Sequence, residues 1–220
     1  MSLPCVELET APNPRHAVIW LHGLGADGHD FEPIVPELVR PGWPPIRFVF
    51  PHAPVRPVSV NAGMRMRAWF DIASLGNEIR LDEAGIRAAI GDLDALVARE
   101  AGRDVAPERI VLAGFSQGGS VVLAGGLRHR ERLAGIAALS TWMPLGTSLP
   151  AERSPANAAT PVFLAHGEFD PVVAPHLGAT TRAALTALGQ PCEWHTYPMA
   201  HQVCGPEIAD LARWLGARFC

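Results

Sequence analysis

The chain has 220 residues and a formal net charge of −4, from 22 acidic residues and 18 basic ones, all of them arginine. Because lysine is absent, the sequence excludes Gly-Lys-Ser/Thr phosphate loops, Schiff-base and pyridoxal chemistry, Ser-Lys dyads and protein kinases. The acidic balance offers no basic footprint for nucleic acid. The hydrophobic share of 48% is enough for a sizeable core, and the length favours one domain over residues 1–220.

The cysteines and the N-terminal residues indicate a cytoplasmic protein. The four cysteines form no CxxC pair, which suits a reducing compartment. The opening residues, MSLPCVELET, lack a charged region followed by an apolar run, so we expect no signal peptide. We also expect no membrane span, because no apolar stretch approaches about 18 residues.

Short apolar runs alternate with amphipathic helical patterns along the chain, which is typical of a doubly wound α/β fold. Most of the runs are predominantly apolar, as in a mostly parallel sheet with helices on both faces. We predict strands at 6–9 (an edge strand), 16–21, 46–50, 109–113, 135–139, 162–165 and 193–197. We predict helices at 82–100, 118–127, 174–188 and 206–219.

Residues 51–80 fit neither pattern. A loop of this length without regular structure is usually functional or disordered, and the methionines and aromatic residues here argue against disorder. We expect the segment to wrap over the ends of the strands. Its arginines Arg56, Arg65 and Arg67 are interpreted as surface charges; facing a substrate, they would act as fixed guanidinium forks.

The sequence GFSQGG at 114–119 joins a predicted strand directly to a predicted helix. This GxSxG pattern in a strand–turn–helix context is typical of a serine nucleophile on a strained turn. Glycines flank Ser116 because larger residues would clash between strand and helix. The helix N-terminus would stabilise a developing oxyanion.

A serine nucleophile needs a base and a group that orients the base, in the chain order serine, acid, histidine. Asp170 follows the predicted strand 162–165, at the sheet edge where such folds place their sites. Glu168 in the same loop is the alternative acid, or a solvated charge.

His201 holds the equivalent position after the strand 193–197 and is the predicted base. His166 is expected to support the loop of Asp170. Cys204, near His201, lacks the strained-turn context of a nucleophile, so we expect a packed thiol. The other downstream histidines are predicted on helix surfaces (His129, His176) or inside a strand (His195).

An oxyanion needs two backbone N–H donors, and one comes from the residue after the nucleophile, here Gln117. The glycine-rich sequence LHGLGADG at 21–28 follows an earlier strand and suits the second donor, for which Leu24 is best placed. Its spacing is not the GxGxxG of a dinucleotide site.

The motifs LHGLGADG, FPHAP with RPV, WFDI, GFSQGG, HGEFDPVV and MAH together resemble the phospholipase/carboxylesterase family of α/β-hydrolases, from about residue 15 onward. The resemblance implies a Ser116–Asp170–His201 triad, with Leu24 and Gln117 as oxyanion donors. It also implies that 51–80 forms part of the acyl pocket. We find no room for a lid domain, and an open groove predicts hydrolysis of short- to medium-chain acyl esters through an acyl-enzyme. The predicted pocket residues are Met66, Trp69, Leu75, Trp142 and Met143.

Several alternatives stay open. Within the family, the sequence does not choose between a carboxylesterase, an acyl-protein thioesterase and a lysophospholipase. From another class, a non-catalytic α/β-hydrolase that binds a ligand is possible, although the complete serine, acid and histidine set disfavours it. A metallohydrolase is disfavoured because there is no HExxH motif. We therefore expect no metal or cofactor, a small acyl ester or thioester as substrate, and, as the commonest assembly, a homodimer.

Overall fold

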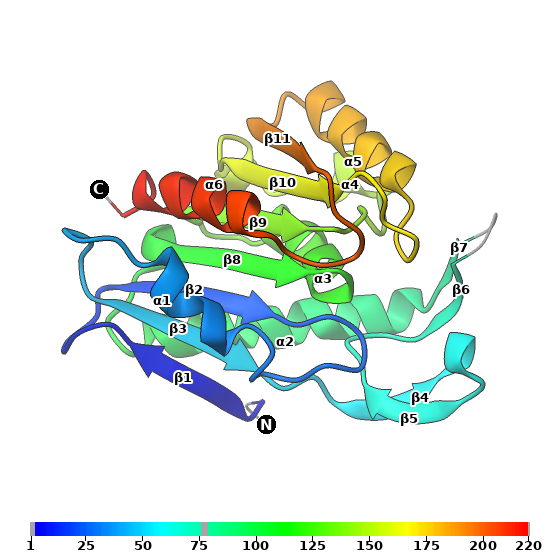
Figure 1. Ribbon diagram of the computed structural model, residues 1–220, viewed down its shortest axis with the longest axis horizontal. Helices are drawn as coiled ribbons and strands as arrows, with labels where there is room; N and C mark the ends of the chain where they lie inside the picture. Colours follow the sequence, from blue (N-terminus) through cyan, green and yellow to red (C-terminus); the bar gives the residue numbers. More distant parts are fainter. Residues whose placement is uncertain (1–2, 76–78, 220) are drawn as a thin grey trace.

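The computed structural model describes residues 3–75 and 79–219, with the backbone alone at 75 and 79–81. A seven-stranded sheet lies at the centre (Figure 1). Only β1 runs antiparallel to its neighbour, at the sheet edge, so the predicted α/β architecture is confirmed. The strand order is β1 (Cys5–Glu9), β3 (Ile46–Pro51), β2 (His16–Leu21), β8 (Ile110–Phe115), β9 (Gly135–Leu139), β10 (Val162–Gly167) and β11 (Cys192–Tyr197).

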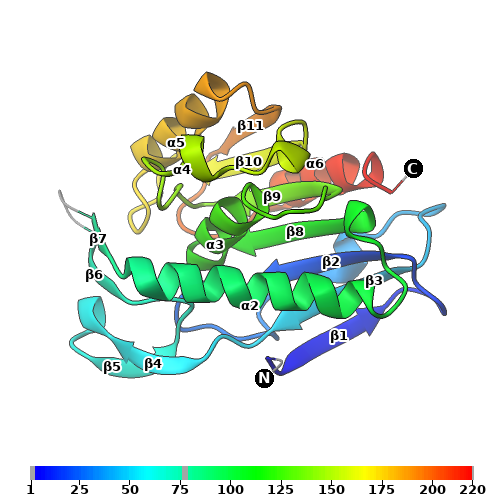
Figure 2. The same ribbon diagram turned by 180° about the vertical axis from the view of Figure 1, so that it is seen from behind.

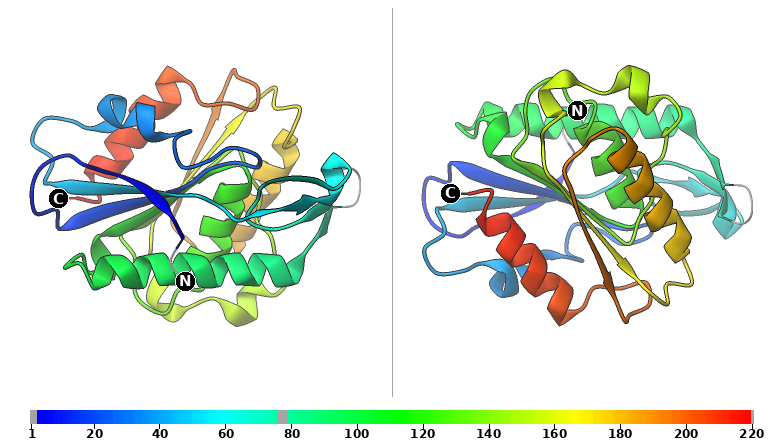
Figure 3. Two further views of the ribbon diagram at one scale, coloured as in Figure 1. Left: turned by 90° about the horizontal axis from the view of Figure 1, so that it is seen from below. Right: turned by 90° about the horizontal axis from the view of Figure 1, so that it is seen from above.

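Helices cover both faces of the sheet (Figures 2 and 3). One face carries α1 (Val35–Leu38) and α6 (Gly205–Gly216). The other carries α2 (Glu83–Ala101), α3 (Gln117–Gly126), α4 (Leu149–Glu152) and α5 (Pro175–Ala187). Short 3-10 turns occur at η1 (Glu32–Ile34), η2 (Ser59–Asn61), η3 (Pro107–Arg109) and η4 (Pro155–Asn157). Across the described residues, no helix combines the length and the apolar character that crossing a membrane requires.

The alternation of side chains along β2 explains why its sequence is apolar throughout. Ile19 and Leu21 pack beneath the helices α2 and α3, whereas Val18 and Trp20 face α1 and α6. Because successive strand residues point to opposite faces, a strand covered on both sides needs apolar residues at every position. The sheet therefore separates two hydrophobic cores.

The segment 51–80 contains more regular structure than its sequence predicts. It forms one hairpin from β4 (Val55–Val58) and β5 (Met64–Arg67), and a second from β6 (Ile72–Leu75) and β7 (Ile79–Leu81). These ribbons lie beyond the carboxyl ends of the parallel strands (Figure 1), as expected for a segment over the strand ends. The strands were missed because each is only three or four residues long and mixes arginine with apolar residues.

A buried carboxylate ties the edge of the sheet to α2. The side chain of Glu100 is 0% exposed and accepts a 2.7 Å hydrogen bond from Arg47 on β3. Arg99 and Arg103 lie 3.0 and 3.1 Å from its other oxygen. Arg47 also bonds Glu9 on β1 at 2.8 Å. Three guanidinium groups thus share the buried Glu100 carboxylate where α2 meets β1 and β3, and Glu7 and Glu9 complete the charge network.

We expect Glu100→Gln to lower the free energy of unfolding in urea by about 3–5 kcal/mol, because it removes the buried charge and leaves two carboxylates, Glu7 and Glu9, to balance three guanidinium groups. The matched control is Glu83→Gln on the same helix. Glu83 is 63% exposed and pairs with Arg87, so its loss should cost under about 1 kcal/mol. Equal losses in the two variants would contradict the importance of the buried network.

Candidate active site

Ser116 lies at the turn between β8 and α3 with φ 54° and ψ −120°, a conformation that costs a non-glycine residue free energy. The neighbouring glycines permit it. A Cβ at Gly118 would lie 2.2 Å from the carbonyl oxygen of Leu21, and one at Gly114 would lie 2.5 Å from the backbone of Gly118. The predicted close packing of strand, turn and helix is therefore present.

The structure brings the three predicted triad residues together. The hydroxyl of Ser116 lies 2.9 Å from Nε2 of His201, and Nδ1 of His201 lies 2.7 Å from Oδ2 of Asp170. The other oxygen of Asp170 accepts the N–H groups of Val172 and Val173 at 2.9 and 2.8 Å. Because the Asp170 side chain is 0% exposed and fully bonded, its orientation is fixed. This geometry lets the imidazole accept the serine proton while the carboxylate holds the ring.

The alternative acid and base residues have other partners. His166 donates from Nε2 to the carbonyl of Val173 at 2.8 Å, so it supports the Asp170 loop as predicted, and burial lowers its pKa. Glu168 is exposed and accepts a bond from Thr196. His195 lies within β11 beside Glu193, at 2.8 Å. None of these bonds involves Ser116.

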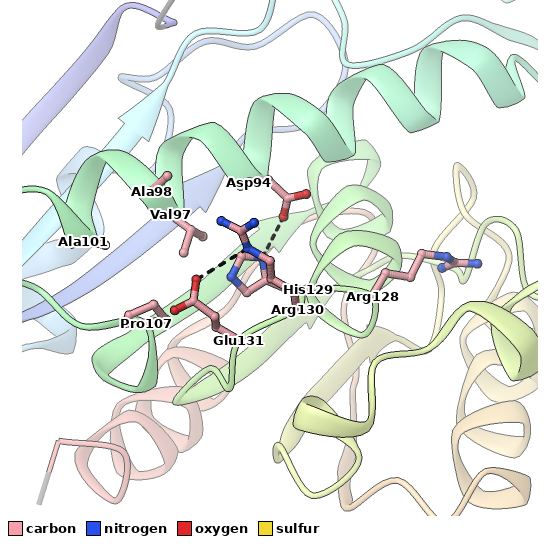
Figure 4. A pocket seen from close by; sticks show the side chains of 9 residues that line it. All are labelled: Asp94, Val97, Ala98, Ala101, Pro107, Arg128, His129, Arg130 and Glu131. Carbon is pink, nitrogen blue, oxygen red and sulfur yellow. Dashed lines mark hydrogen bonds and ion pairs between the residues drawn. The ribbon is translucent and has the colours of Figure 1, made fainter.

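The prediction that His129 lies on a helix surface is wrong. The residue is 6% exposed, and its Nδ1 lies 2.7 Å from Oδ1 of Asp94 (Figure 4). The reason is that α3 ends at Gly126 and the following turn carries the ring against α2. The pair lies at the opposite end of α3 from Ser116. In the part of the chain that the structure describes, no three potential metal ligands gather, here or elsewhere.

The predicted oxyanion loop lies directly against Ser116, since a Cβ at Gly23 would be 3.5 Å from the serine Cβ. Among the described residues, the N–H of Leu24 has no hydrogen-bond acceptor. The N–H of Gln117 stands at the first position of α3, where no intrahelical acceptor exists. Within the described residues, both predicted donors therefore have an N–H group without a hydrogen-bond acceptor.

The predicted pocket residues divide into different environments. Trp142 and Met143 line a cavity of about 550 Å³ between the start of α2, the turn after β9 and α5. Trp69 is only 1% exposed, so the prediction that it lines an open groove is wrong. Its indole donates to the carbonyl of His22 and its backbone N–H to Gln117 Oε1, so it supports the oxyanion residues from beneath.

The other two predicted pocket residues belong to the segment 55–75. Met66 is half-buried, and its sulfur lies 3.7 Å from a Cβ built on Gly25 in the oxyanion loop. The side chain of Leu75 lies outside the described residues. Two arginines of this segment bond backbone carbonyls: Arg67 donates to Ala53 at 2.9 Å and the exposed Arg65 to Val55 at 3.3 Å, whereas Arg56 is half-buried.

Sequence reasoning missed one supporting residue of the turn. Thr141 donates its hydroxyl to the carbonyl of Ser116 at 2.6 Å and lies 2.9 Å from the hydroxyl of Ser120. Its position just after β9 was the available signal, because the ends of neighbouring parallel strands meet at one sheet edge. The signal was weak because threonine is also common in turns that have no such role.

Comparison with known proteins shows the family to which the chain belongs. The sequence model of the phospholipase/carboxylesterase family matches residues 4–218. An acyl-protein thioesterase 1 of Mycosarcoma maydis is 39% identical, covering 92% of this chain and 90% of the relative. Among solved structures, SOBER1 of Arabidopsis thaliana superposes with a TM-score of 0.88 at 30% identity, covering 94% of this chain and 100% of that one. Acyl-protein thioesterase 2 of Zea mays gives 0.87 at 27% identity and 99% coverage of both chains.

The fold and the serine turn define an α/β-hydrolase, and the enzyme is a serine hydrolase of the carboxylesterase type. The chain belongs to the phospholipase/carboxylesterase family.

We expect Gly118→Ala to lower the free energy of unfolding by about 1–3 kcal/mol and to reduce activity, because its Cβ would collide with the backbone at Leu21. The control is Gly91→Ala on the exposed side of α2, where a Cβ meets nothing within 4 Å. That variant should be stabilised by about 0.5–1 kcal/mol. Thermal and urea unfolding of both proteins measure the contrast, and equal effects would rule out the steric explanation.

Proposed function

We propose that the enzyme hydrolyses acyl esters and thioesters through a covalent acyl-enzyme. Ser116 is the nucleophile, His201 the general base and Asp170 the group that orients the base. The N–H groups of Leu24 and Gln117 bind the oxyanion. The observation that carries the proposal is the unbroken hydrogen-bond chain from the Ser116 hydroxyl through the imidazole to a buried, fully bonded carboxylate.

The reaction follows from this arrangement in two halves. As Oγ of Ser116 attacks the acyl carbonyl, its proton passes to Nε2 of His201, and the oxyanion forms beside the two N–H groups. Each such donor is worth about 3–4 kcal/mol in the transition state. His201 then returns the proton to the departing alcohol or thiol. Water, deprotonated by the same imidazole, hydrolyses the acyl-enzyme and regenerates the serine.

The cavity beside the turn after β9 is our candidate for the acyl chain. Trp142 and Leu145 supply apolar walls, and Leu177 and Thr181 close it from α5. Thr141 bonds the carbonyl of Ser116 and immediately precedes Trp142 in the chain, and this connection to the serine turn is the reason for choosing the cavity. Between β9 and β10 the described chain forms only α4 and η4. A site without a covering domain favours short- to medium-chain substrates.

Three classes of leaving group are compatible with the proposed mechanism: an alcohol, a protein thiol and a glycerophosphate. Relatives with 37–39% identity are named acyl-protein thioesterases, which supports testing thioesters first. A panel of p-nitrophenyl esters, S-acyl peptides and lysophospholipids with the same acyl chain isolates the leaving group. The highest kcat/KM identifies the preferred class.

Replacing the nucleophile tests the mechanism directly. We expect Ser116→Ala to lower kcat by roughly 10⁴–10⁶ and to abolish labelling by a fluorophosphonate probe. Labelling of the wild-type enzyme should be unaffected by chelators. Ser154→Ala serves as the control, because Ser154 only caps the turn η4. Retention of most esterase activity in Ser116→Ala would refute the proposal.

Filling the cavity tests the acyl site. Ala184 on α5 lines it, and we expect Ala184→Phe to reduce kcat/KM for octanoyl esters by about tenfold or more while sparing acetyl esters, since apolar contact area is lost only for the longer chain. Ala183→Phe, at the neighbouring exposed position, is the matched control. An equal loss for acetyl and octanoyl esters would place the acyl chain elsewhere.

A further inference from the structure

The predicted oxyanion loop, residues 21–28, is hydrogen-bonded to the segment that follows β3. The N–H of Gly28 donates to Nδ1 of His52 at 3.0 Å. In the opposite direction, the N–H of Ala53 donates to Nε2 of His22 at 3.1 Å. Both ends of the loop thus use an imidazole nitrogen as the acceptor of a backbone N–H.

We propose that His52 is a positioning residue for catalysis, whose neutral imidazole fixes the far end of the oxyanion loop so that the Leu24 N–H stays beside Ser116. The proposal rests on the proposed function, because it assigns Leu24 as an oxyanion donor. His52 does not touch the reacting atoms; it acts through the Gly28 backbone.

The surroundings of His52 make it a rigid anchor. Its backbone N–H donates to the carbonyl of Pro4 at 2.8 Å, and prolines at 51 and 54 restrict the backbone on both sides. On the loop side, a Cβ at Gly28 would lie 2.4 Å from the carbonyl oxygen of Phe50 and 3.2 Å from Cε1 of His52. No side chain fits between loop and anchor, so the hydrogen bond is the specific link between them.

The middle of the loop is fastened to the same region. The N–H of Gly25 donates to the carbonyl of Arg67 on β5 at 2.9 Å. The guanidinium of Arg67 returns to the carbonyl of Ala53, next to His52. The hairpin β4–β5 and His52 therefore hold the loop as one unit.

The link exists only while Nδ1 of His52 carries no proton. Burial and the nearby Arg67 lower the pKa of His52 below its ordinary value of 6.5, against the opposing charge of Asp27. The ring of His29, which pairs with Glu32 at 3.0 Å, lies 5.7 Å from that of His52. Protonation would turn the acceptor into a donor facing the Gly28 N–H.

His22 also needs an unprotonated ring nitrogen. Its Nδ1 lies 2.7 Å from the carbonyl of Gly23, and its Nε2 accepts the N–H of Ala53. Burial lowers its pKa as well. For both histidines the unfolded chain binds protons more readily than the folded one below about pH 6.5. The stabilisation is therefore complete above the ordinary histidine pKa and declines as the pH falls below it.

Two substitutions separate the hydrogen bond from the titration. His52→Asn places an amide oxygen near the position of Nδ1 but does not titrate, whereas His52→Leu removes the acceptor. We expect His52→Leu to lower kcat about 10–100-fold with KM within about threefold of wild type, because a misplaced donor weakens only transition-state binding. His52→Asn should keep kcat within about threefold near pH 8 and show a shallower acidic limb in kcat/KM.

His176→Leu, which removes an exposed histidine on α5, should leave the whole pH profile unchanged. An acidic limb in His52→Asn identical to that of wild type would overturn the inference, even if His52→Leu failed to fold. So would a folded His52→Leu with wild-type kcat. Ser116→Ala distinguishes the two proposals: activity in that variant refutes the mechanism itself, whereas an inactive Ser116→Ala with an unaltered His52 series refutes only the positioning role.

Discussion

The close approach of α3 to the end of β2 is the constraint on which the site depends. In the sheet, β2 and β8 are neighbours, and the chain leaves them in opposite directions, toward β3 and toward β9. Such a switch point opens a crevice at the carboxyl ends of the strands. Because Gly118 has no side chain, α3 begins against the carbonyl of Leu21, and the loop after β2 then lies beside Ser116. This packing therefore brings the Ser116 hydroxyl next to the glycine-rich loop after β2.

The proposed acid and base come from the next parallel strands, and backbone hydrogen bonds fix their spacing. Beyond the β10–β11 pairing, the N–H of Glu168 donates to the carbonyl of Tyr197 at 2.8 Å, and that of Phe169 to Met199 at 3.1 Å. A Cβ at Gly167 would lie 2.3 Å from the carbonyl oxygen of Ala200, so the two loops touch. The backbone contacts of the two loops therefore determine the spacing of Asp170 and His201, independently of the bond between their side chains.

Structural features that depend on consecutive residues could be predicted from the sequence. Seven buried or edge strands and the loops after them carry their signal in consecutive residues, so Ser116 and His201 were found at strand ends. The hairpins of residues 55–81 were not predicted because strands of three or four residues are defined by their pairing rather than by periodicity. The burial of His129 depends on Asp94, 35 residues away along the chain. No local window contains that contact.

The absence of lysine divides the charges around the site into two kinds. Arginine side chains stay charged at every relevant pH, and Arg67, beside the loop after β2, also donates to the backbone carbonyl of Ala53. For the Ser116 hydroxyl and for the N–H groups of Gly28 and Ala53, the proton acceptors are histidine nitrogens. His22, His52 and His201 each present a nitrogen that must be unprotonated to work, two as acceptors of backbone N–H groups and one beside the serine hydroxyl. Protonation of any of these nitrogens would remove an acceptor, so loop geometry and proton transfer from the serine depend on protons in the same direction.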